Sequence, residues 1–205
     1  MKLIVFSGFL GAGKTVTILS FAKWLLQKST AGKDTSLVVL ENEIGDVAYD
    51  KTMLKSRGLT VKNLLSGCIC CTLSTDLPVQ LGEIKAEYDP DYVIIEPTGA
   101  AFVDRIKQAV SYAGVDGRDV SIITVVDTSR MSKLMIVAPY LIENQIRNAD
   151  ILLLSKTDLT ADKEVSEAKA IVDEFYNGTI IENTPYGIDD ADAFWEKVIG
   201  RYGQF

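Results

Sequence analysis

The sequence contains no histidine, and its cysteines are confined to one short segment. Because histidine is the commonest general base and the commonest nitrogen ligand, any metal here must be held by sulfur, carboxylate, backbone oxygen or water. The three cysteines, Cys68, Cys70 and Cys71, lie too close together to form a disulfide framework. We expect them to be reduced thiols in a cytoplasmic protein.

Long apolar runs and basic runs are also lacking. No segment is long enough to cross a membrane, and the apolar run Leu3–Phe6 is too short for a signal peptide. The net charge of −7 argues against a nucleic-acid-binding surface. A chain of 205 residues suits one well-cored domain, which we expect to occupy residues 1–205.

Short apolar runs alternate with segments of helical period, which is the α/β pattern. Runs that are apolar throughout are typical of parallel strands covered by helices on both faces. We therefore predict a mostly parallel, twisted sheet with helices on both faces, and a last helix at Ala191–Arg201. The six predicted strands are Leu3–Phe6, Leu37–Leu40, Tyr92–Ile95, Ser121–Val126, Ile151–Leu154 and Thr179–Ile181.

The segment Gly8–Thr15 fits the pattern G-x-x-x-x-G-K-[ST] of a phosphate-binding P-loop, between a predicted strand and a predicted helix. Its glycines let backbone amides turn toward phosphate oxygens, and the helix N-terminus adds positive potential. Lys14 should reach the β and γ phosphates, and the Thr15 hydroxyl should bind Mg²⁺. The other nucleotide-binding positions predicted here are Gly8, Gly11, Ala12, Gly13 and Val16.

Glu96-Pro97-Thr98-Gly99 directly follows the predicted strand Tyr92–Ile95. An acidic residue at the carboxyl end of a buried strand beside a phosphate loop can hold Mg²⁺ or its water shell. Gly99 leaves a bare amide that can approach the γ-phosphate. By itself the segment could equally be a turn that ends a strand, and the preceding phosphate loop favours the nucleotide interpretation.

Ser155-Lys156-Thr157-Asp158 follows another predicted strand and resembles the guanine-reading N-K-x-D element, with serine in place of asparagine. The Asp158 carboxylate can accept from guanine N1 and its exocyclic amine, a pair that adenine lacks. Lys156 can lie along the face of the base. Asn183 and Thr184 are positioned to close over its other side. This pattern favours GTP over ATP.

Taken together, these motifs resemble the CobW-type GTPases, in the wider nucleotide-binding metallochaperone family that includes HypB and UreG. The resemblance also covers the switch-like segment Glu41–Asp46 (ENEIGD), the segment Gly67–Cys71 (GCICC) and the region Gln145–Leu159. It implies a GTP-hydrolysing metal chaperone or insertase with a metalloenzyme client. The second, C-terminal domain usual in CobW-type proteins is not expected within this chain.

Three thiolates that converge can supply three ligands of a tetrahedral site and leave the fourth open, which suits a metal that is handed on. Sulfur favours Zn²⁺ or Cu⁺ over Mg²⁺, and Co²⁺ is also compatible. The resemblance implies that Glu41 and Asp46 can add oxygen ligands, although both can equally be ordinary loop charges. The alternatives for the cysteines are burial as small apolar residues or a redox pair.

The cysteine segment lies between the switch-like segment and the Glu96 turn, so we hypothesise that GTP closes both neighbours and that hydrolysis loosens the metal. No glutamine follows Gly99 and no arginine stands out as a finger in cis. We therefore predict slow intrinsic hydrolysis, accelerated by a client or by a nucleotide-dependent homodimer. Glu43 is the predicted water-positioning residue, with Lys14 and Glu96 as the other catalytic candidates.

Three other functions stay open at this point. One is a P-loop ATPase or small-molecule kinase with a redox cysteine loop. Another is a metal-storage or redox-sensing module that nucleotide only regulates. The third is a GTPase that gates the loading of a cobalamin-type or other metallocofactor enzyme. Asp158 separates the first from a GTPase, because it should make GTP outcompete ATP.

Overall fold

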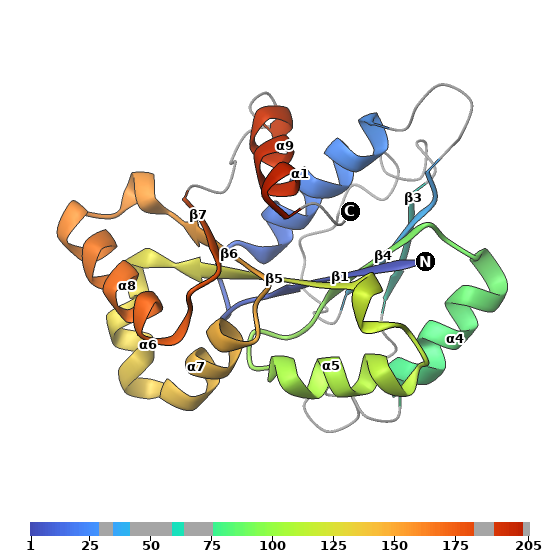
Figure 1. Ribbon diagram of the computed structural model, residues 1–205, viewed down its shortest axis with the longest axis horizontal. Coiled ribbons are helices and arrows are strands. Elements are labelled where there is room, and N and C mark those ends of the chain that lie inside the picture. The colour runs from blue at the N-terminus through green and yellow to red at the C-terminus, as the bar shows by residue number, and fades with distance from the viewer. Residues whose placement is uncertain (29–34, 42–58, 64–75, 183–190, 203–205) are drawn as a thin grey trace.

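The computed structural model describes residues 1–28, 35–41, 59–63, 76–182 and 191–202 (Figure 1). Within these ranges a parallel sheet of seven strands has the order β3-β2-β4-β1-β5-β6-β7. The strands are β1 Lys2–Ser7, β2 Leu37–Glu41, β3 Leu59–Asn63, β4 Tyr92–Glu96, β5 Val120–Asp127, β6 Ile151–Ser155 and β7 Thr179–Glu182.

Helices cover both faces of the sheet, as Figure 1 shows. Helices α1 (Lys14–Gln27) and α9 (Ala191–Tyr202) pack on one face, where alternate strand residues such as Phe6 and Ile123 point. The other face is covered by α4 Asp76–Tyr88, α5 Val103–Tyr112, α6 Met131–Val137, α7 Pro139–Arg147 and α8 Asp162–Phe175. Across the described ranges, no helix combines the length and the apolar character that a bilayer span requires.

The predicted α/β class, the parallel sheet and the six predicted strands are confirmed. The sheet also contains β3, which the sequence analysis did not predict. Its sequence, Leu-Thr-Val-Lys-Asn, alternates apolar and polar residues, as expected of a strand at the edge of a sheet. A search for continuous apolar runs does not find such a strand.

Helix α9 is anchored to α1 by one buried aromatic residue. The side chain of Trp195 is fully buried, and its ring packs edge-on against Phe21 with 4.8 Å between centroids. Its indole N–H donates to the Ser20 hydroxyl at 2.9 Å, which satisfies the polar atom inside the core. The contact joins the last described helix to the helix that follows the phosphate loop.

We expect Trp195→Ala to lower the free energy of unfolding by about 3–5 kcal/mol, since it removes a large buried ring and leaves a cavity. Urea unfolding followed by circular dichroism measures this. Tyr112→Ala is the control, because that ring is 65% exposed and its loss should change stability by less than about 0.5 kcal/mol. Equal effects of the two substitutions would contradict the anchoring role.

Candidate functional site

The candidate site lies at the edge of the sheet where the parallel strands end. Strand β1 runs into the loop Gly8–Gly13, and α1 begins at Lys14. Gly8 and Gly13 have φ angles of +138° and +101°, a region that favours glycine. A Cβ at Gly8 would lie 2.3 Å from the Val125 carbonyl oxygen, so the loop passes directly against β5.

Two predicted magnesium ligands contact each other across the sheet edge. The Thr15 hydroxyl, at the start of α1, donates to Glu96 Oε1 at 2.7 Å. Glu96 ends β4 and is only 5% exposed. Glu41 ends β2, and its backbone pairs in register with that of Glu96. The structure therefore brings the hydroxyl and the carboxylate that the sequence nominated to one place.

The turn after β4 lies against the phosphate loop. A Cβ built on Gly99 would be 2.3 Å from the Leu10 backbone nitrogen, so only glycine permits this approach. On its other side the turn is held by α7, where the Gln145 amide donates to the Gly99 and Ala101 carbonyls at 3.1 and 3.2 Å. Gln145 is buried, so these bonds are shielded from water.

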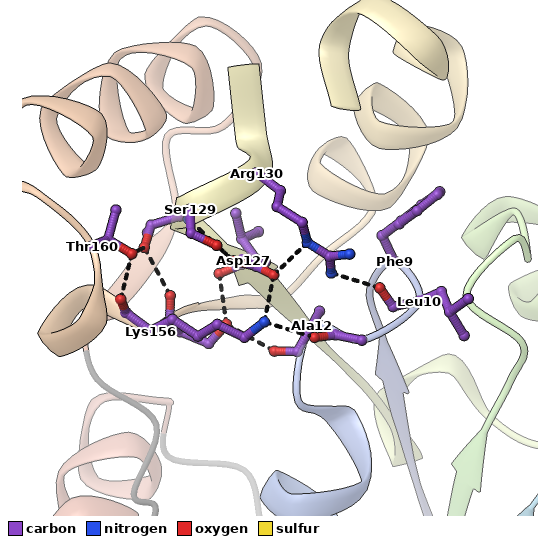
Figure 2. Close-up of polar contacts among 12 residues, drawn as sticks. Phe9, Leu10, Ala12, Asp127, Ser129, Arg130, Lys156 and Thr160 are labelled. Atoms are coloured by element: carbon purple, nitrogen blue, oxygen red, sulfur yellow. Dashed lines mark hydrogen bonds and ion pairs between the residues drawn. The ribbon is translucent and has the colours of Figure 1, made fainter. Parts of the chain in front are cut away.

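The carbonyls of the phosphate loop accept hydrogen bonds from several side chains (Figure 2). Lys14 is buried, and its Nζ lies 3.4 Å from the Phe9 carbonyl oxygen. Three further contacts are Arg130 Nη2 to Leu10 O at 2.7 Å, Lys156 Nζ to Gly11 O at 3.0 Å, and Ser155 Oγ to Ala12 O at 2.8 Å. Within the loop Ala12 is buried, whereas Val16 on α1 is 45% exposed.

Asp127, the last residue of β5, stands between two of these side chains, as Figure 2 shows. Its Oδ2 accepts from Arg130 Nε and from Lys156 Nζ, both at 2.7 Å, and its side chain has no solvent exposure. Burial raises the pKa of this carboxyl, but hydrogen bonds from Lys156, Ser129 and Arg130 together lower the pKa below its usual value. Asp127 is therefore a buried, ionised carboxylate with two cationic partners.

The segment predicted to read guanine lies beside the loop. Lys156 has a left-handed backbone, with φ of +61°, and Asp158 is exposed in the short helix η3 (Thr157–Leu159). The Ser155 side chain is fully buried and donates to the loop carbonyl rather than facing outward. In this segment, therefore, Asp158 presents its carboxylate to solvent.

Several predicted site residues lie outside the described residues: Glu43, Asp46, Cys68, Cys70, Cys71, Asn183 and Thr184. Their roles stay predictions. In the part of the chain that the structure describes, no cluster of three or more cysteine, aspartate or glutamate side chains is arranged to hold a metal ion.

The sequence analysis missed Asp127, Arg130 and Gln145. Asp127 carried a usable signal, because it directly follows the apolar run Ser121–Val126, as Glu96 follows its own strand. The sequence carried no usable signal for Arg130, because its contact with Leu10 spans 120 positions of the chain. Gln145 lies in the region of family resemblance, but its contacts depend on how α7 packs against the turn after β4.

Known proteins with similar sequences include two zinc chaperones. The chain is 31% identical to the zinc chaperone CobW of Sinorhizobium sp over 209 residues, which cover 85% of this chain and 55% of that protein. It is 31% identical to the zinc chaperone YjiA of Escherichia coli (strain K12) over 170 residues, covering 77% and 50% respectively. The chain thus spans about half the length of these curated relatives.

Among solved structures, the hydrogenase maturation factor HypB of Archaeoglobus fulgidus has the same fold, with a TM-score of 0.58 and 15% identity, covering 97% of this chain and 90% of that one. The Zn(II)-bound YjiA GTPase from E. coli matches with a TM-score of 0.51 and 21% identity, covering 89% and 56%. Residues 2–181 match the family described as CobW/HypB/UreG, nucleotide-binding domain. The chain belongs to the CobW/HypB/UreG family of nucleotide-binding domains.

Proposed function

We propose that this protein is a GTP-binding and GTP-hydrolysing metallochaperone, which holds a soft metal ion on its cysteine segment and releases it to a metalloenzyme client according to the bound nucleotide. The observation that carries the proposal is the Thr15–Glu96 contact beside the phosphate loop. It joins a P-loop hydroxyl to an acidic strand end at 2.7 Å, which is the pairing that nucleotide hydrolysis with a divalent cation needs.

In this proposal the backbone amides of the phosphate loop and the N-terminus of α1 bind the phosphates. Lys14 neutralises the β and γ phosphates, and the Gly99 amide approaches the γ-phosphate from the turn after β4. The Thr15 and Glu96 oxygens are the hard ligands that suit Mg²⁺, which when bound offsets charge that develops on the transferred phosphoryl group. Glu43 orients the attacking water.

Asp158 reads guanine in this proposal, supported by its exposed position in η3 and by the position of Lys156 beside the loop. The cargo metal, Zn²⁺ or Co²⁺, is bound by the thiolates of Cys68, Cys70 and Cys71. The zinc chaperone names of the relatives support zinc as the first choice. Hydrolysis is slow for the protein alone and accelerates with a client or in a homodimer.

Asp158→Asn should raise the Kd for GTP by on the order of tenfold or more, because a carboxylate that accepts two guanine hydrogens is replaced by an amide. The Kd for ATP should stay unchanged, so the preference for GTP falls. Competition against a fluorescent GDP analogue measures both values. Asp162→Asn, another exposed aspartate nearby at the start of α8, is the matched control. Unchanged GTP preference in Asp158→Asn would remove this residue from the base site.

Gly99→Ala should weaken binding of a non-hydrolysable GTP analogue by about tenfold or more, and that of GDP by less. The added methyl group cannot fit against Leu10, so the turn must move away from the γ-phosphate position. Isothermal titration calorimetry with both nucleotides measures the difference. Gly82→Ala is the control, since a Cβ at that helical position meets nothing within 4 Å. Equal losses for GDP and the GTP analogue would contradict a γ-phosphate contact.

The complete proposal is tested by titrating the reduced protein with Zn²⁺ against a competing chelator, with GDP–Mg²⁺ and with a non-hydrolysable GTP analogue and Mg²⁺. We expect the Zn²⁺ affinity to differ between the two nucleotides by about fivefold or more, the usual lower range of coupling between sites. Cys70→Ser should abolish that difference while leaving nucleotide binding intact. Equal Zn²⁺ affinities would exclude nucleotide-gated release of zinc, and absence of both Zn²⁺ and Co²⁺ binding would exclude metal carriage by this segment.

A further inference from the structure

The phosphate loop is held from outside along three consecutive peptide groups. The carbonyl of Leu10 accepts from Arg130, that of Gly11 from Lys156 and that of Ala12 from Ser155. None of the three donors belongs to the loop itself: Ser155 is the last residue of β6, and Lys156 and Arg130 follow the carboxyl ends of β6 and β5. The loop's conformation is therefore imposed by neighbouring strands as well as by its glycines.

A trans peptide group is planar, and its carbonyl and its N–H point in opposite directions. The Leu10 carbonyl shares a peptide group with the Gly11 amide, and the Ala12 carbonyl shares one with the Gly13 amide. A side chain that holds these carbonyls turns the two amides to the side away from the donor, where a phosphate-binding loop presents amides to its ligand. The Ala12 amide, which shares a peptide group with the Gly11 carbonyl, instead donates to the Phe9 carbonyl at 3.1 Å.

Two of the three donors, Arg130 and Lys156, depend on one acceptor. Both donate to Asp127 Oδ2 at 2.7 Å, and Ser129 holds the other carboxylate oxygen through its backbone N–H at 3.1 Å and its hydroxyl. Arginine and lysine side chains lose considerable rotamer freedom when they are fixed, and two cations at one place repel each other. The buried carboxylate offsets both costs.

We propose that Asp127 is a positioning residue for the phosphate loop, which acts through Arg130 and Lys156 to hold the Leu10 and Gly11 carbonyls and so presents the Gly11 amide to the phosphates of the nucleotide. This inference rests on the proposed nucleotide-binding function and deepens it. In this proposal Asp127 acts through these partners and does not itself contact phosphate or base. Removing the Asp127 carboxylate should therefore raise the Kd of every nucleotide that carries a β-phosphate by the same factor, whatever its base.

The test measures the Kd of GDP and of inosine diphosphate, which lacks the exocyclic amine of guanine, by calorimetry on the full chain. Asp127→Asn should raise both values by on the order of tenfold, the effect of losing a charge-assisted hydrogen bond. The ratio of the two Kd values should stay that of the wild type. A variant that had merely lost part of its folded population would instead show a lower binding stoichiometry.

Asp116→Asn is the matched control. Asp116 also forms an ion pair with an arginine, Arg118 at 2.7 Å, but it is exposed in the segment that precedes β5, at the opposite end of that strand from Asp127. The Asp116→Asn variant should bind both nucleotides with the Kd values of the wild type. Arg130→Ala is the second variant, because its side chain is 39% exposed and its loss is tolerable for folding. It should raise both Kd values by a few-fold, and adding Asp127→Asn should cost less than the two separate effects combined.

The results distinguish a failure of the proposed function from a failure of the positioning role. If the wild type fails to bind GDP, both the proposed function and this inference fall. If the wild type binds and Arg130→Ala and Asp127→Asn bind equally well, the positioning role is overturned while the proposed function stands. The ratio of the Kd for inosine diphosphate to the Kd for GDP could also fall toward one. Such a fall would show that Asp127 serves base recognition, which also overturns the inference. Should Asp127→Asn not fold, Arg130→Ala alone decides by the same criteria.

Discussion

The candidate site depends on one buried carboxylate. Asp127 occupies the end of the strand between β1 and β6, and its register partner on β6 is Ser155, the residue before Lys156. Because the sheet fixes that register, the carboxylate and the lysine meet without any adjustment of the loops. An isolated buried charge would cost several kcal/mol, roughly, and the cations Arg130 and Lys156 together with Ser129 offset that cost. The loop preceding α1 is thus attached to a buried end of the sheet.

On its opposite side the loop contacts an acidic residue and a glycine turn. The Thr15 hydroxyl meets the Glu96 carboxylate, and Gly99 approaches Leu10 so closely that no side chain fits between them. One side of the loop is therefore held by the cationic side chains Arg130 and Lys156. The other side faces an acidic residue and a turn, and in the proposed function this is the side where hydrolysis takes place and the last phosphate is contacted.

Sequence reasoning reached the α/β class, the parallel sheet and the strand–loop–helix context of Gly8–Thr15, because these follow from local periodicity and a spaced motif. It also nominated Thr15 and Glu96, which the fold brings into contact. It did not find β3, whose alternating pattern carries less signal than an apolar run. Arg130 and Gln145 were beyond it, since their roles arise from contacts across 120 and 46 positions of the chain that no local pattern encodes. Ser155 shows the same limit: the motif placed it in the base-reading segment, and only the packing shows that its hydroxyl donates to the Ala12 carbonyl.

The hydrogen bonds of Gln145 have a consequence for how the turn after β4 can move. Gln145 is only 2% exposed, so water does not replace the Gly99 and Ala101 carbonyls if the turn moves out of hydrogen-bonding distance. An unsatisfied buried donor costs about 1–3 kcal/mol, which penalises every intermediate position. The turn should therefore occupy a small number of discrete positions and not a continuous range of them. It should change position only when a bound nucleotide contributes enough binding energy to break these hydrogen bonds.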